Sequence, residues 1–227
     1  MNEIALSADQ NLEDEIELAR LHLAQLMRQK WQRTNKEPID PAPVLHPRIV
    51  GDVKLFATRE EMISSLPKGG RVMEIGTWAG TFAWEILQRM EPKELHVIDI
   101  DFSKFDYAKF GDVIGKRVFI HQGDSQHLLS VIANDSFDFV YVDGDHSYGG
   151  ARHDIMEALR IVRVGGLVGI NDYTTWCACL VMPFGVMKAA NEVLNNQGHK
   201  IRYIGLHHNG NHDIVVEKGL SGAIDSA

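Results

Sequence analysis

Two carboxylates and an imidazole lie within four residues of one another in the second half of the chain. Asp143, Asp145 and His146 follow the apolar residues 140–142, which are typical of the end of a buried strand. Carboxylates gathered at a sheet edge repel one another, so a cation, a hydrogen-bond network or raised pKa values should compensate them. An imidazole with a pKa of about 6.5 can accept a hydroxyl proton at neutral pH. A loop histidine with a purely structural role is the alternative interpretation.

Further oxygen donors follow the next predicted strand, residues 167–170. Asn171 and Asp172 come directly after it. If the two strands are neighbours in a parallel sheet, Asp143, Asn171 and Asp172 converge at one edge. Hard oxygen donors of this kind suit Mg²⁺, which binds a few protein oxygens and keeps other positions for water or substrate.

A glycine loop follows the first strand of this series, predicted over residues 71–75. Gly76 and Gly80 permit a tight turn and a close approach of a ligand to the backbone. A dinucleotide-binding loop has a third glycine and holds a pyrophosphate, which Glu74 would repel. A nicotinamide-dependent oxidoreductase is therefore a disfavoured alternative, and a cationic ligand suits the loop better. Trp78 in this loop either flanks the ligand or packs in the core.

Two later strand ends carry polar residues that suit a nucleoside. Asp99, at the end of a strand predicted over 95–100, can accept hydrogen bonds from a pair of ribose hydroxyls. Asp124 and Ser125 follow the strand predicted over 118–121. Each signal is weak alone, and their order along the chain makes them informative together.

The pattern Glu74-x-Gly76-x-x-x-Gly80 resembles motif I of the class I S-adenosylmethionine-dependent methyltransferases. Residues 143–150 and 171–173 resemble those of bacterial small-molecule O-methyltransferases related to catechol and caffeoyl-coenzyme A O-methyltransferases. The resemblance covers about residues 68–217 and implies S-adenosyl-L-methionine as cofactor, with Asp99 at the ribose and Asp124 near the adenine. The cofactor-binding residues that we carry over are Glu74, Gly76, Thr77, Gly80, Asp99, Asp124, Ser125 and Asp145.

The same resemblance implies catalytic roles for Asp143 and His146. In metal-dependent relatives the residue that matches Asp143 binds the metal, and two further oxygen ligands correspond to Asn171 and Asp172. His146 stands where the catechol-type enzymes have a lysine base. The order Asn-Asp departs from the Asp-Asn or two acids of those relatives and lowers the charge of the expected Mg²⁺ site.

We therefore expect an O-methyltransferase, assisted by Mg²⁺, that acts on a hydroxyl of a small molecule such as a sugar, a polyketide or a phenolic compound. A family relative with a different reaction, such as a hydroxylase, or one that only binds its ligand, is the alternative, because a fold does not determine its chemistry.

Short apolar runs that alternate with helical stretches after residue 70 predict an α/β fold built from βαβ units. The resemblance implies a Rossmann-like, doubly wound sheet of seven mostly parallel strands with an antiparallel last strand. A short helix capped by Thr58 and Glu61 should precede the sheet. The strands are predicted over 71–75, 95–100, 118–121, 137–142, 167–170, 201–206 and 213–217, and the other helices over 11–31, 80–90, 125–133 and 151–162.

Three parts are predicted along the chain. Residues 1–50 comprise an N-terminal helix, capped by Asn11, and a proline-rich connector. Residues 51–218 form the S-adenosylmethionine-binding methyltransferase domain, and residues 219–227 form a flexible tail. The helix and connector should either cover the substrate side or form a dimer contact, so a homodimer or higher homo-oligomer is a possible assembly.

Composition restricts the partners. The net charge of −8, without a basic cluster, argues against nucleic acid. No run approaches the ~20 apolar residues of a membrane span, and the acidic N-terminal segment does not resemble a signal peptide. Cys177 and Cys179 are too close for a stabilising disulfide or a zinc site, so we expect reduced thiols in the cytoplasm. His207, His208 and His212 are interpreted as turn residues of a terminal hairpin, with pocket-lining or metal-binding roles as alternatives.

Overall fold

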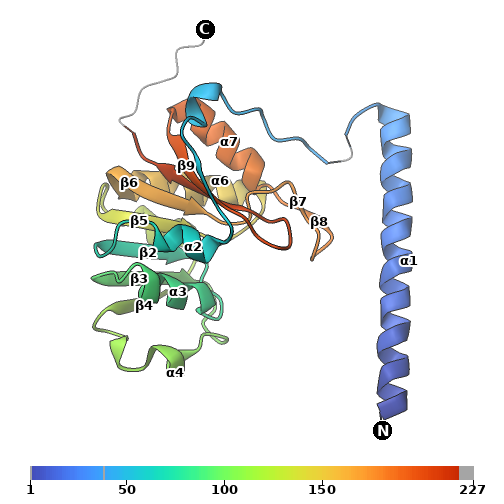
Figure 1. Ribbon diagram of the computed structural model, residues 1–227, viewed down its shortest axis with the longest axis horizontal. Helices are drawn as coiled ribbons and strands as arrows, with labels where there is room; N and C mark the ends of the chain where they lie inside the picture. The colour runs from blue at the N-terminus through green and yellow to red at the C-terminus, as the bar shows by residue number, and fades with distance from the viewer. Residues whose placement is uncertain (1, 38, 220–227) are drawn as a thin grey trace. The chain divides into compact units, whose positions relative to one another are not determined.

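The chain forms two compact units, Met1–Pro41 and Ala42–Ala227, in a computed structural model that describes residues 2–37 and 39–219. The described part of the first unit is the long helix α1 (Asn2–Thr34) and the few residues after it (Figure 1). Asn11 lies inside this helix, so its prediction as the N-cap was wrong. Most of the predicted C-terminal tail, residues 220–227, lies outside the described residues.

The second unit is built on one mostly parallel sheet in the order β1-β9-β10-β6-β5-β2-β3-β4 (Figure 1). β10 is antiparallel to both of its neighbours, β6 and β9, whereas the other pairs are parallel. The bounds are β1 (Lys54–Phe56), β2 (Arg71–Ile75), β3 (Glu94–Asp99), β4 (Val118–Gln122), β5 (Phe137–Val142), β6 (Val162–Ile170), β9 (Lys200–Gly205) and β10 (Asp213–Glu217).

The expected Rossmann-like α/β fold is confirmed, and every predicted strand is present. The eighth strand, β1, extends the seven-stranded sheet by pairing in parallel with β9. Its three residues are too few to show an alternating pattern, which explains why the sequence did not predict it. The predicted terminal hairpin joins β9 to β10.

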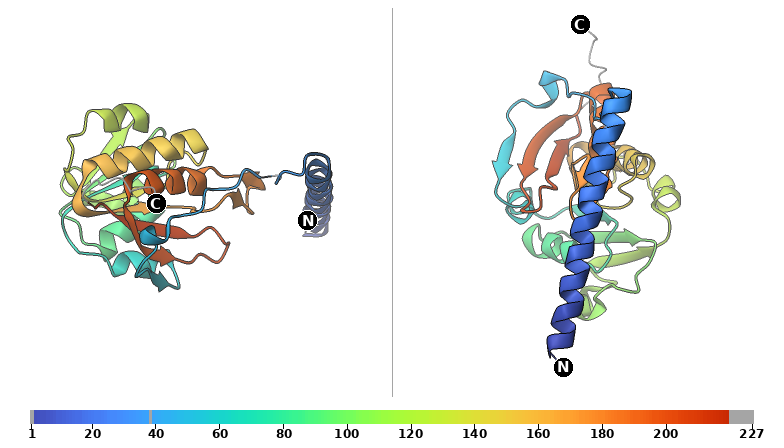
Figure 2. Two further views of the ribbon diagram at one scale, coloured as in Figure 1. Left: turned by 90° about the horizontal axis from the view of Figure 1, so that it is seen from above. Right: turned by 90° about the vertical axis from the view of Figure 1, so that its right-hand side faces the viewer.

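Helices cover both faces of the sheet, as an edge-on view shows (Figure 2). One hydrophobic core contains side chains of α5, α6 and α7, and the other contains side chains of α2, α3 and α4. The helix α7 was not predicted, although Val186, Ala189 and Val193 are buried at helical spacing. The bounds are α2 (Arg59–Ser64), α3 (Thr81–Arg89), α4 (Tyr107–Phe110), α5 (Ser125–Ser130), α6 (Tyr148–Ile161) and α7 (Val186–Gln197), with single 3₁₀ turns at Pro47–Ile49 and Gly111–Val113.

The end of the proline-rich connector is held against α7. Asn191 Nδ2 donates to the Pro43 carbonyl at 2.6 Å, and Asn195 Nδ2 donates to the Val44 carbonyl at 3.0 Å. The backbone N–H of His46 donates to Asn195 Oδ1 at 2.9 Å. Residues 42–50 therefore belong to the second compact unit, Ala42–Ala227.

A local cap fixes the start of α2. The Thr58 hydroxyl accepts a hydrogen bond from the backbone N–H of Glu61 at 3.1 Å, which is the predicted cap. The loop after β6 contains a small two-stranded hairpin, β7 (Trp176–Cys177) and β8 (Met182–Pro183). These segments surround the carboxyl ends of the parallel strands, where open α/β sheets bind their ligands.

Candidate functional site

Glycine is required at the turn after β2 because two strand ends approach closely there. Gly76 has a φ of 81°, and a Cβ atom at this position would lie 2.1 Å from the carbonyl oxygen of Asp143. Gly80 has a φ of 76°, and its Cβ would lie 2.6 Å from the Phe105 ring. Any other residue would push the end of β2 away from the end of β5, or the start of α3 away from the aromatic cluster.

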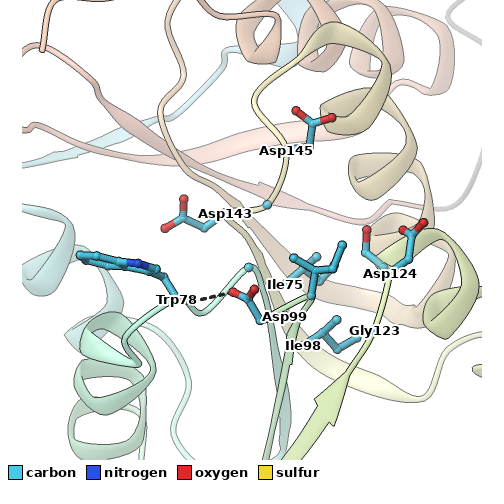
Figure 3. Close-up of a pocket in the computed structure, with 12 residues that line it drawn as sticks. Ile75, Trp78, Ile98, Asp99, Gly123, Asp124, Asp143 and Asp145 are labelled. Carbon is cyan, nitrogen blue, oxygen red and sulfur yellow. Dashed lines mark hydrogen bonds between the residues drawn. The ribbon is translucent and has the colours of Figure 1, made fainter. Parts of the chain in front are cut away.

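A cavity of about 420 Å³ opens at the carboxyl ends of β2, β3, β4 and β5 (Figure 3). The predicted cofactor residues Gly76, Asp99, Asp124, Ser125 and Asp145 all line it, together with Asp143. The other lining residues are Ile75, Trp78, Ile98, Ile100, Gly123 and Gly144. The structure thus brings together side chains from four strand ends that are up to 70 positions apart in the sequence.

Asp99 organises the glycine loop from the floor of this cavity. Its Oδ2 accepts hydrogen bonds from the backbone N–H groups of Thr77 at 2.9 Å and Trp78 at 2.7 Å. The second of these bonds is drawn in Figure 3, where the carboxylate lies between the loop and the Ile75 and Ile98 side chains. Asp99 therefore holds the loop in addition to facing the cavity.

Trp78 is a cavity wall and not a core residue. It has a φ of 44°, a left-handed conformation that is unfavourable for a bulky side chain, and it is 70% exposed. Its indole lies on the same side of the cavity as the Asp143 carboxylate (Figure 3). An exposed indole held in a strained conformation at a cavity is a surface available to a ligand.

Glu74, Thr77 and Gly80 are not among the cavity-lining residues. Glu74 is only 1% exposed and accepts a hydrogen bond from the Thr77 hydroxyl. Burial raises the pKa of Glu74 to about 8, so its carboxyl is mostly protonated at neutral pH. Glu74 therefore supports the glycine loop through the Thr77 hydroxyl, as a mostly neutral group. The sequence had suggested a charged carboxylate that faces a cationic ligand.

The predicted oxygen donors converge on one atom, Nε2 of His146. This nitrogen lies 3.6 Å from Asp143 Oδ1 and 3.4 Å from Asp172 Oδ2. It also lies 3.4 Å from Asn171 Oδ1. The imidazole stacks on the Phe184 ring with 4.6 Å between centroids, which determines its orientation.

A buried polar network lies behind this convergence point. Asn171 Nδ2 donates to the Tyr141 hydroxyl at 3.2 Å and to Asp213 Oδ1 at 3.2 Å. The Tyr141 hydroxyl donates to the other oxygen of Asp213. Because both partners engage the amide nitrogen of Asn171, its oxygen faces His146.

A cation from the start of α2 completes the network. Arg59 Nη1 donates to the Tyr141 hydroxyl at 3.4 Å, and the guanidinium lies 4.2 Å from the centre of the Phe82 ring. Burial raises the pKa of Asp213 to about 6. Burial and the neighbouring Glu74 also raise the pKa of Asp143 well above its ordinary value. The expected compensation for crowded carboxylates thus takes all three forms: a cation, hydrogen bonds and raised pKa values.

Asp143, Asn171 and Asp172 fit a hard divalent ion by donor type, because three oxygens face one point. The fit involves only two carboxylates and one amide oxygen, and the imidazole of His146 lies at that point. In the described ranges 2–37 and 39–219, no group of three or more His, Cys, Asp or Glu side chains is arranged to hold a metal ion.

Sequence reasoning missed Arg59, Tyr141, Asp213 and Phe184. Arg59 and Tyr141 are separated by 82 positions and Tyr141 and Asp213 by 72, so no local spacing could connect them. The sequence signal available was an acidic residue, Asp213, at the start of an apolar strand. A charged residue in such a place requires a buried partner.

The hairpin histidines lie at a separate, open pocket with Thr58 and Glu60. The rings of His207 and His208 are 4.3 Å apart, and the N–H of His207 donates to His212 Nδ1 at 3.2 Å. Cys177 and Cys179 are both free thiols, the first buried and the second exposed.

Comparison with known proteins agrees with this geometry. Residues 73–173 match a family model described as a methyltransferase domain. Proteins named "Putative O-methyltransferase" from Mycobacterium ulcerans and Mycobacterium marinum are each 32% identical to this chain over 115 residues, which are 48% of this chain and 50% of each relative. The chain thus spans about half the length of the curated relatives that it matches.

Two solved structures share the fold. A protein from Corynebacterium glutamicum aligns with a TM-score of 0.56 at 17% identity, over 92% of this chain and 99% of that protein. The pyocyanin biosynthetic protein PhzM aligns with a TM-score of 0.55 at 15% identity, over 72% of this chain and 55% of PhzM.

These matches agree with the resemblance that the motifs indicated: residues 73–173 are similar to a methyltransferase domain, and about half of the chain is similar to proteins named as O-methyltransferases. They do not favour the oxidoreductase alternative. Within the part of the chain that the structure describes, no helix is both long and apolar enough to cross a membrane.

Glu74→Gln should make the free energy of unfolding less dependent on pH. Folding raises the pKa of Glu74 from 4.5 to about 8, so the folded protein holds an extra proton between these pH values. Its stabilising contribution is complete below about pH 4.5 and is lost as the pH rises to about 8, by up to a few kcal/mol. Urea unfolding at pH 5, 6.5 and 8 measures this slope.

The matched control is Glu17→Gln at an exposed position on α1, which should leave the slope as in the unmodified protein. An equally steep decline in Glu74→Gln would show that Glu74 does not bind the extra proton.

Proposed function

We propose that this protein is an S-adenosylmethionine-dependent O-methyltransferase that acts on a hydroxyl of a small molecule. The observation that carries the proposal is that the nucleoside-sized cavity and the His146 cluster share one residue, Asp143. A cofactor in the cavity would therefore lie beside a proton acceptor. The names of the mycobacterial relatives and the matched domain support the same reaction.

The cavity residues divide the recognition of the cofactor between them. Asp99 would accept hydrogen bonds from the ribose hydroxyls, and the 123–125 segment would face the adenine. Asp145 lines the same cavity from the loop after β5. The preponderance of carboxylates over cations on this wall favours a ligand with positively charged sulfonium and ammonium groups.

S-adenosylmethionine would supply an electrophilic methyl group, and Mg²⁺ held by Asp143, Asn171 and Asp172 would lower the pKa of the acceptor hydroxyl. His146 Nε2 is the atom that would accept the hydroxyl proton as the oxygen attacks the methyl carbon. Sulfur would keep the electron pair of the broken carbon–sulfur bond, so that S-adenosylhomocysteine would remain. Phe184 holds the imidazole in place, so the rate would depend mainly on orientation and electrostatics.

Sugars, polyketides and phenolic natural products are the acceptors that we propose to test. The free thiols of Cys177 and Cys179 are compatible with a reducing cytoplasm, which we propose as the site of the reaction. The exposed Trp78 offers an aromatic face to an acceptor that reaches the methyl group past Asp143.

Calorimetry should detect binding of S-adenosylhomocysteine, and Asp99→Ala should weaken it by about tenfold or more. The substitution removes two hydrogen bonds that hold the glycine loop, each worth about 1 kcal/mol. Asp101→Ala is the matched control, because the Asp101 carboxylate is exposed and binds Ser103. If the well-folded unmodified protein takes up no adenosyl compound, the proposed function is wrong.

Release of S-adenosylhomocysteine in the presence of candidate acceptors should fall when EDTA is added and recover when Mg²⁺ is restored in excess. The expected dependence follows from the oxygen donors that converge beside the cavity. If EDTA does not reduce turnover, the proposed metal role is wrong, whereas the proposed methyl transfer is not contradicted.

His146→Ala should lower kcat by about 10²-fold or more, as expected for loss of a general base. Its affinity for S-adenosylhomocysteine should stay unchanged, since His146 is not among the cavity-lining residues. His127→Ala removes an exposed histidine of α5 and serves as the control. Undiminished kcat in His146→Ala would mean that another group accepts the proton.

A further inference from the structure

The helix α1 carries a regular apolar row. Leu12, Ile16, Ala19, Leu23 and Leu26 follow one another at intervals of four, three, four and three residues. This spacing averages 3.5 residues, which is the repeat of a left-handed coiled coil and not the 3.6 of a straight helix. The row is therefore suited to a second long helix as its partner.

The first unit has no second element to cover this row. Among its described residues α1 is the only helix or strand. A lone helix gains little stability in water from its own backbone, and most helical stability comes from packing of an apolar face. Residues from 42 onward are anchored to α7 through Asn191 and Asn195, so residues 35–41 connect α1 to that anchored segment.

Charges beside the row are complementary to those of a second copy of the same helix. In the heptad that places Ile16 and Leu23 at position a, Glu15 occupies position g and Arg20 occupies position e. In a parallel coiled coil, position g of one helix lies beside the following position e of the other helix. In a parallel, in-register pair, Glu15 of each copy meets Arg20 of the other. A two-fold axis makes this contact twice.

We propose that α1 is a dimerisation helix that pairs in parallel with α1 of a second copy of this chain. We favour a second copy of α1 as the partner because the apolar row has a coiled-coil repeat. In addition, Glu15 of one copy and Arg20 of the other carry opposite charges. The dimer would place two methyltransferase domains on one coiled-coil stem. This proposal does not depend on whether the proposed reaction is correct.

Sedimentation of the full-length protein should show a dimer, and Leu23→Asp should raise the dimer dissociation constant by at least about 100-fold, because it buries a charge in the row. Leu21→Asp is the matched control: it makes the same change on the same helix outside the row and should leave the dimer intact. Far-UV circular dichroism and the thermal unfolding of the second unit report whether each variant is folded.

A charge exchange tests the orientation without altering the apolar row. Glu15→Arg and Arg20→Glu should each weaken the dimer, and the double variant E15R/R20E should restore it, because the pairs re-form with reversed sign. A monomeric unmodified protein, or a dimer unaffected by Leu23→Asp, overturns the proposal. If the double variant dimerises no more tightly than the single variants, the parallel arrangement is wrong. If the unmodified protein is a monomer in which Leu23→Asp lowers the thermal stability of the second unit, the row packs within its own chain and the proposal is wrong.

Discussion

Repulsion between carboxylates at one edge of the sheet is the constraint on which the rest of the site depends. Glu74 and Asp213 are buried, and the pKa of Asp143 is raised first by its own burial and then by these two carboxyl groups. Uncompensated, such a group would destabilise the fold by several kcal/mol. Protonation of Glu74, hydrogen bonds from Tyr141 and Asn171, and the guanidinium of Arg59 compensate this repulsion.

The same compensation gives the site its geometry. Because Tyr141 and Asp213 engage the amide nitrogen of Asn171, the amide oxygen is turned toward His146. Because Gly76 lets the end of β2 touch the backbone of Asp143, the cavity and the His146 cluster adjoin. The stabilising network and the candidate catalytic group are therefore parts of one hydrogen-bonded structure. A substitution in either part would alter the geometry of the other.

Several features follow from short stretches of sequence and were predicted correctly. The glycine loop, the capped start of α2, the apolar strands and the terminal hairpin all depend on residues within a few positions of one another. The features that were missed have a different character. The strand β1 is only three residues long and exists because β9 lies beside it. The helix α7 was also not predicted, although its buried residues recur at helical spacing.

The amino-acid sequence by itself determined the α/β class, the order of the strands along the chain and the donors available at each strand end, because these follow from periodicity and residue type. Only the tertiary structure decided which donors meet. The sheet order places β10 next to β6 and β6 next to β5, and this brings Asp213 to Tyr141. It also decided that Glu74 is buried and neutral, since the pKa of a carboxyl depends on its desolvation, which no local pattern specifies.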